Sequence, residues 1–136
     1  MKLEGYLTET AKTVLNVEGF EYVADRPVAD GGENLGMSPH GYLLASIAGC
    51  KAMVAESFLR ANEHAFERVE VEVESDLQGR RREERIDIVV DMRIVGADLN
   101  EADERYLKQF IDGACPMANL LTAGGSNTVK TEIVVV

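Results

Sequence analysis

The stretch that decides the fold is "SPHGYLLASIAGCKAMVAESFLRAN", residues 38–62. Ser38 and Pro39 predict the start of a helix, because serine can cap free backbone amides and proline already has the helical φ at the first position. Nothing stops this helix before about Asn62, since its two glycines are tolerated in a helix interior. In the first half, apolar side chains cover almost every direction around the axis, which is typical of a buried central helix.

The segments before the helix predict short strands. They read "GYLTET", "KTVLNV" and "FEYVAD", residues 5–10, 12–17 and 20–25, and Gly19 marks a turn between the last two. A loop, residues 25–37, leads from the third strand to the helix.

The segments after the helix predict two strands, two helices and a final strand. Val69, Val71 and Val73 alternate with glutamates, and a second alternating run covers residues 86–94. This period of two indicates two strands that each bury one face. Further along the chain, Asn100 caps a helix to about Gly113, Pro116 opens a short helix, and residues 128–136 form a strand. The order predicts one α+β domain, residues 1–136, with a largely antiparallel sheet laid against the long apolar helix.

The long helix has more apolar surface than one sheet can cover. A sheet covers one side of a helix, whereas the first half of this helix is apolar nearly all round. A second copy of the chain is the simplest cover. We therefore expect a homodimer in which the two helices of residues 39–62 lie in a shared interior.

Composition excludes several classes of partner. The chain has 136 residues and a net charge of -10, so it would be repelled by nucleic-acid phosphates and by anionic membranes. Its longest apolar stretch, Tyr42 to Cys50, has nine residues, well short of the ~20 that cross a bilayer. The one basic cluster, residues 80–82 with Arg85, is typical of a solvated hairpin tip. Two cysteines and no secretory leader predict a cytoplasmic protein.

The two cysteines have different settings. Free cysteine is most often inert core packing, and each thiol taken alone favours that role. However, Cys115 precedes Pro116 at the start of a helix, where free amides stabilise a thiolate. Cys50 lies inside the long helix without such help and shares a face with Ser46 and Met53. Lys51 is expected on the solvent face of the helix with Glu56 and Arg60. It lies about a hundred degrees around the axis from Cys50, so a contact between them cannot be assumed.

A cation from elsewhere in the chain would be needed to activate Cys50. Among the first 49 residues the only arginine is Arg26, in the loop that leads into the helix. A thiolate, a guanidinium and apolar walls suit attack on a peroxide O–O bond, after which a second thiol captures the sulfenic acid as a disulfide. Apolar walls favour an organic peroxide over hydrogen peroxide. A zinc site would need Cys50, Cys115, His40 and His64 to converge, and we expect no metal.

Two stretches resemble a known family, the osmotically inducible protein C and organic hydroperoxide resistance proteins (OsmC/Ohr). They are "ADRPVADGGENLGMSPHGYLLASIAGCKAM" and "DGACPMANLL", which resemble the glycine loop, proline-started helix and helix cysteine of the family, and its second cysteine. The resemblance implies an intertwined α+β homodimer whose active sites use both subunits. It also implies that Cys50 attacks the peroxide, that Cys115 resolves it, and that a dithiol such as a lipoylated protein reduces the disulfide. No cofactor belongs to the implied reaction.

The sequence departs from the family pattern in two places: at the residue after the helix-starting proline, and at the arginine, because Arg26 comes after the early strands, next to the loop. In the peroxidases of the family a glutamate follows the helix-starting proline and pairs with an arginine on an early strand, whereas His40 occupies that position here. Glu33 in the glycine loop could supply the carboxylate, although a solvated turn residue is the simpler interpretation. His40, Glu33, Ser46 and Met53 are therefore candidate pocket residues. The cysteine pair favours an organic hydroperoxide peroxidase, and the missing glutamate favours an alternative, a homodimer that binds a small hydrophobic ligand at its interface.

Overall fold

The computed structural model describes residues 1–10, 12–78 and 85–136, and it has the mixed α+β fold that the sequence predicts. The predicted hairpin-tip residues 80–82 lie outside the described residues. The described chain divides into two compact units, Met1–Leu43 and Leu44–Val136, and each unit is described here by itself. The grouping of both units into one domain stays a prediction.

The N-terminal unit is a three-stranded antiparallel meander. Its strands are β1 (Leu3–Leu7), β2 (Thr13–Val17) and β3 (Phe20–Ala24), and β2 pairs with both neighbours. Glu18 and Gly19 join β2 to β3 with φ angles of 50° and 87°. Two successive residues with positive φ make a tight hairpin turn that follows the twist of the strands, which explains the predicted turn at Gly19.

Asp25 fixes the loop between β3 and the long helix, which includes the short 3-10 helix η1 (Val28–Asp30). The Asp25 side chain is buried, and its carboxylate accepts hydrogen bonds from the backbone amides of Arg26 at 2.7 Å, Leu35 at 3.0 Å and Glu33 at 3.2 Å. These bonds, chiefly the one from Leu35, hold the pKa of Asp25 below its usual value. A Cβ atom at Gly36 would lie 2.0 Å from the Val23 carbonyl oxygen, so the chain needs glycine there.

The long helix α1 (Pro39–Ala61) begins and ends where the sequence predicts, within one residue. The Ser38 hydroxyl accepts a hydrogen bond from the Gly41 amide at 3.1 Å, as expected of a capping serine. By length and composition alone α1 could cross a membrane, although its longest uninterrupted apolar run is short. Buried core helices of soluble proteins meet the same criterion.

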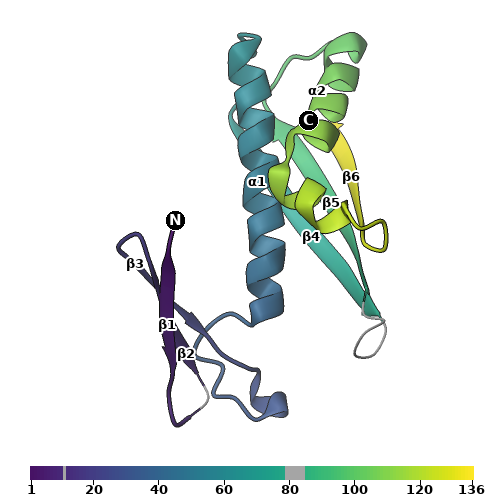
Figure 1. Ribbon diagram of the computed structural model, residues 1–136. Coiled ribbons are helices and arrows are strands. Elements are labelled where there is room, and N and C mark those ends of the chain that lie inside the picture. The colour runs from purple at the N-terminus through teal and green to yellow at the C-terminus, as the bar shows by residue number, and fades with distance from the viewer. Residues whose placement is uncertain (11, 79–84) are drawn as a thin grey trace. The chain divides into compact units, whose positions relative to one another are not determined.

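The C-terminal unit is a three-stranded sheet with helices packed beside it. Strand β4 (Arg68–Gln78) pairs antiparallel with β5 (Arg85–Val95), and β5 pairs parallel with β6 (Thr128–Val135). Helices α2 (Glu101–Ala114) and α3 (Pro116–Thr122) connect β5 to β6. Figure 1 shows α2 beside the later part of α1 and α3 farther back along the same helix, toward its start. Every predicted element is present, although the first strand runs from Leu3 to Leu7 instead of residues 5–10. The described strands form two three-stranded sheets instead of one, and three of the four pairings are antiparallel.

One face of the second sheet forms the core with α1 and α2. The strand register places Val71, Met92 and Ile133 side by side on this face. The buried positions of α1 are four residues apart: Ile47, Lys51, Ala55 and Leu59. The expectation that Lys51 lies on the solvent face is therefore wrong, because a four-residue spacing keeps it on the buried stripe. Glu56 and Arg60, by contrast, lie on the outer side of the helix as predicted, where they form an ion pair.

Candidate active site

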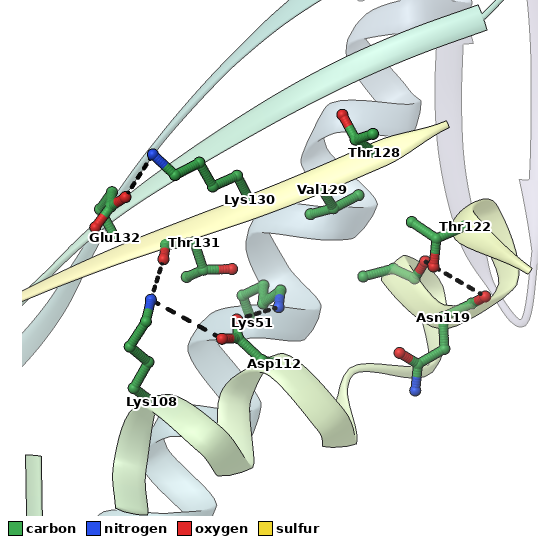
Figure 2. A pocket seen from close by; sticks show the side chains of 11 residues that line it. Lys51, Lys108, Asp112, Asn119, Thr122, Thr128, Val129, Lys130, Thr131 and Glu132 are labelled. Atoms are coloured by element: carbon green, nitrogen blue, oxygen red, sulfur yellow. Dashed lines mark hydrogen bonds and ion pairs between the residues drawn. The ribbon is translucent and has the colours of Figure 1, made fainter. Parts of the chain in front are cut away.

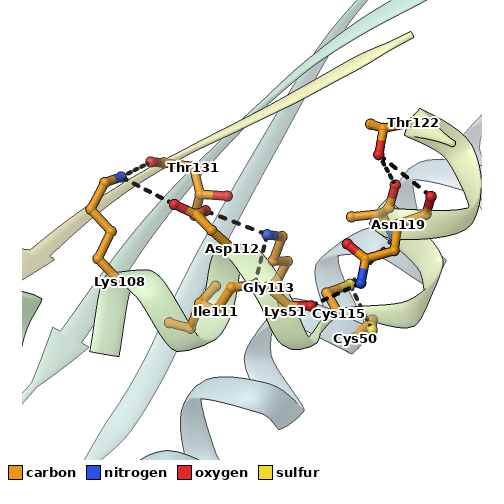
Figure 3. Close-up of polar contacts among 11 residues, drawn as sticks. Cys50, Lys51, Lys108, Ile111, Asp112, Gly113, Cys115, Asn119, Thr122 and Thr131 are labelled. Atoms are coloured by element: carbon orange, nitrogen blue, oxygen red, sulfur yellow. Dashed lines mark hydrogen bonds and ion pairs between the residues drawn. The ribbon is translucent and has the colours of Figure 1, made fainter. Parts of the chain in front are cut away.

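The fold of the C-terminal unit brings the two cysteines together. The Cys115 thiol donates a hydrogen bond to the Cys50 sulfur, and the two Sγ atoms are 2.7 Å apart (Figure 3). Both are free thiols. Cys115 is fully buried, whereas Cys50 is only partly buried. The pair is 65 residues apart in sequence, so packing of α1 against the junction of α2 and α3 creates the contact.

Cys115 is held by the junction between α2 and α3. Cys115 is both the C-cap of α2 and the N-cap of α3, and its sulfur accepts a hydrogen bond from the Ala118 amide at 3.5 Å. The Asn119 side chain donates to the Gly113 carbonyl at 2.8 Å, which ties the two helices together. The last carbonyls of a helix lack partners within it, so this bond also satisfies the end of α2. The predicted N-cap position of Cys115 is confirmed.

Lys51 provides a buried positive charge in the same place. Its ammonium donates a hydrogen bond to the Ile111 carbonyl at 3.0 Å and lies 3.7 Å from the Asp112 carboxylate. Its side chain is 2% exposed, whereas that of Asp112 is 46% exposed. A cation is stabilised at a helix C-terminus, because the unpaired carbonyls there carry partial negative charge. The Lys51 ammonium therefore lies at the C-terminal end of α2, beside Ile111 and Asp112, a few residues before Cys115.

Opposing effects act on the Cys115 thiol. Burial raises its pKa above the ordinary value, and the hydrogen bond with Cys50 raises it further. The Ala118 amide and the charge of Lys51 act in the opposite direction and lower this pKa. In the resting state Cys115 is consequently a protonated donor.

An apolar groove leads to the cysteine pair. It has a volume of about 570 Å³ and lies between α1 and the start of α3. Its lining is mostly hydrocarbon and sulfur, and consists of Ala45, Ser46, Gly49, Cys50, Met53, Val54, Ser57, Pro116 and Met117. A molecule in this groove would reach Cys50 rather than Cys115, because Cys115 is not among the lining residues and is fully buried.

The predicted site residues fall into two groups. Cys50, Ser46 and Met53 line the groove in the C-terminal unit, and Cys115 lies beneath it. Arg26, Glu33 and His40 belong to the N-terminal unit: the first two are exposed on the loop before α1, and His40 is the second residue of that helix. Their roles at the thiols stay predictions.

Lys51, Asp112 and Asn119 are the polar site residues that sequence reasoning missed. A signal for Lys51 was present, since it lies four residues from both Ile47 and Ala55 and so continues an apolar stripe. No comparable signal existed for Asn119, because its partner at Gly113 depends on the sharp junction at Cys115.

Comparison with known proteins identifies the family. The OsmC-like protein family matches residues 31–132. A solved OsmC-like protein from Mycoplasma pneumoniae is 16% identical, with 99% of this chain and 96% of that chain covered and a TM-score of 0.81. An organic hydroperoxide resistance protein OsmC from Legionella pneumophila is 18% identical (98% and 96% covered, TM-score 0.76), and OhrB of Bacillus subtilis is 17% identical (98% and 96%, 0.70). No curated protein matches the sequence. The predicted resemblance is confirmed, and this chain belongs to the OsmC-like protein family.

Proposed function

We propose that this protein is a thiol peroxidase that reduces organic hydroperoxides through Cys50 and Cys115. The observation that carries the proposal is the 2.7 Å separation between the sulfur of Cys50, which lines an apolar groove, and the buried sulfur of Cys115. Family membership supports a peroxidase-like role, since two of the solved relatives are named organic hydroperoxide resistance proteins.

The exposure of the two thiols assigns their roles in the proposal. Cys50 lines the groove, so the peroxide reaches its sulfur first. Cys115 is fully buried and already in contact with the Cys50 sulfur, so it is placed to resolve the intermediate. In this arrangement the hydrogen bond from Cys115 stabilises negative charge on the attacking sulfur, the role predicted for the Arg26 guanidinium.

The reaction balances without a cofactor. The Cys50 thiolate attacks the outer oxygen of ROOH, the O–O bond breaks, and the alkoxide takes a proton to leave as ROH. Cys50 is then a sulfenic acid. The sulfur of Cys115 attacks the Cys50 sulfur, a disulfide forms, and the hydroxyl leaves as water after taking the proton of Cys115. A dithiol reductant, such as a lipoylated protein, restores both thiols and is itself oxidised to a disulfide.

The apolar lining sets the class of peroxide. Met53, Val54 and Met117 offer hydrocarbon and thioether surface to a substrate, which favours an alkyl or aryl hydroperoxide over hydrogen peroxide. We place the reaction in the cytoplasm, where a dithiol reductant is available.

A stoichiometric titration tests the proposed function. When reduced protein is mixed with less than one equivalent of cumene hydroperoxide, we expect two thiols to be lost for each peroxide consumed, with a Cys50–Cys115 disulfide in the peptide map. Free thiols are counted with a chromogenic thiol reagent, and hydrogen peroxide serves as the comparison, which we expect to react more slowly. Unchanged thiols would reject the peroxidase and favour the alternative, a protein that binds a small hydrophobic ligand.

We also propose that the working form is a homodimer. Only one stripe of α1 is buried within the chain, and large apolar side chains stay exposed in the C-terminal unit, among them Met53 at 71% and Leu120 at 73%. Exposed apolar surface on this scale is typical of an interface. Native mass spectrometry of the reduced protein at micromolar concentration is expected to give the mass of two chains. A monomer under these conditions would contradict the proposal.

A further inference from the structure

A second hollow, separate from the apolar groove, lies between α2, α3 and β6. Its volume is about 410 Å³, within the range of small-molecule sites. Most of its lining residues carry polar or charged groups, although their hydrocarbon parts supply much of the surface, and Lys51 of α1 contributes to it as well. In Figure 2 Lys51, Lys108, Asp112 and Thr131 lie together toward one end, and Asn119 lies toward the other.

The charges of this polar hollow do not cancel. Lys51 and Lys108 share a single carboxylate, Asp112, at 3.7 Å and 3.9 Å. The remaining lysine, Lys130, has its own partner in Glu132 at 2.8 Å. Among the lining residues alone, three ammonium groups face two carboxylates, which leaves one positive charge over in a chain whose net charge is -10. Asp91, outside the lining, also acts on Lys130. A ligand with a single negative charge would neutralise this excess positive charge.

Thr131 adds an unused donor in the same place. Among residues 1–10, 12–78 and 85–136, its hydroxyl is the one buried side-chain oxygen or nitrogen without a hydrogen-bond partner. The residue is 3% exposed and lines the polar hollow. Burying an unpaired hydroxyl is unfavourable, and a valine of the same shape would avoid this cost. The unpaired hydroxyl therefore indicates a ligand with an atom that accepts its hydrogen bond.

Lys51 also has donor capacity to spare. Its ammonium carries three N–H groups, and within the described part of the chain its one hydrogen bond goes to the Ile111 carbonyl. Asp112, at 3.7 Å, is an ion pair beyond hydrogen-bond distance. The side chain is almost fully buried, so water competes poorly for the remaining N–H groups.

We propose that this polar hollow binds a small carboxylate, whose oxygens accept hydrogen bonds from the Lys51 ammonium and the Thr131 hydroxyl. One uncompensated positive charge matches a carboxylate better than a phosphate dianion. The polar walls favour a short, hydroxylated molecule. The inference does not rest on the thiol chemistry, because neither Lys51 nor Thr131 reacts in it.

A nuclear magnetic resonance titration tests the carboxylate site. ¹⁵N-labelled reduced protein is titrated with sodium lactate at constant ionic strength, with sodium chloride and sodium phosphate as comparisons. We expect saturable shifts at the amides of residues 108–112, 118–119 and 130–132 with lactate alone. Saturation by phosphate instead, or shifts with lactate that only match those with chloride, would overturn the proposal.

Substitution of Thr131→Val gives the second readout. We expect lactate to bind about tenfold more weakly or worse, since a hydrogen bond to a charged group is lost. The apo variant should melt at a higher temperature than the wild type, because an unpaired buried hydroxyl has been removed. Thr13→Val, in the N-terminal unit, is the matched control and should bind lactate normally. Lys51→Met should also weaken binding, and unchanged affinity in both Thr131→Val and Lys51→Met would reject the site.

Discussion

Replacement of Cys50 by serine is expected to abolish peroxide-dependent thiol loss completely, leaving Cys115 reduced. Cys115 has no access to the groove, and its raised pKa keeps it protonated in the resting protein. A serine hydroxyl cannot replace the attacking sulfur, because it is far less nucleophilic at neutral pH. The measurement is the count of free thiols after addition of one equivalent of cumene hydroperoxide.

Cys115→Ser provides the complementary result. We expect peroxide to be consumed once, and Cys50 to remain as a sulfenic acid that dimedone traps with a stoichiometry near one per chain. The two variants control for each other, because each removes one sulfur from the same contact. If Cys50→Ser protein still lost its remaining thiol to peroxide, Cys115 would be the attacking residue and the assigned roles would be reversed.

Local signals explain why the helices and strands could be predicted from the sequence. Ser38 caps α1, and Asn100 caps α2 by accepting bonds from the amides of Ala102 and Asp103 at 2.9 Å and 3.0 Å. Each of these contacts spans at most three residues, so the residue types alone carry the information. The parallel pairing of β6 with β5 was not foreseen, because it depends on how α2 and α3 return the chain to the sheet.

The site was predicted only in part, for reasons that differ between residues. The cysteines could be selected from their settings, yet their contact depends on packing between segments 65 residues apart. Lys51 was misplaced because a charged residue is normally exposed, and this rule outweighed a four-residue spacing that placed it on the buried stripe. That a cation distant in the sequence activates Cys50 stays a prediction. Lys51 is next to Cys50 in the sequence and donates a hydrogen bond at the end of α2. Its charge acts on Cys115.

Lys51→Met is expected to slow closure of the disulfide after Cys50 has been oxidised. The charge of Lys51 lowers the pKa of Cys115, so its removal raises that pKa further. At a pH below the pKa, the fraction of thiolate falls about tenfold for each unit of increase, and the closing rate falls in proportion. The deficit should shrink as the pH approaches the pKa of Cys115, because the thiol then ionises without help. Stopped-flow measurement of closure across a range of pH detects this pattern.

A direct titration of Cys115 separates this electrostatic role from a structural one. In a Cys50→Ser background only Cys115 contributes to the ultraviolet absorbance of thiolate, and we expect its midpoint to move to higher pH when Lys51→Met is added. Arg60→Met is the matched control, since it removes one positive charge from the exposed side of the same helix. Stability should change little, because Asp112 is 46% exposed and water can solvate its carboxylate once the ammonium is gone. An unchanged midpoint would show that Lys51 only holds the end of α2 through the Ile111 carbonyl, with no electrostatic role at the thiols.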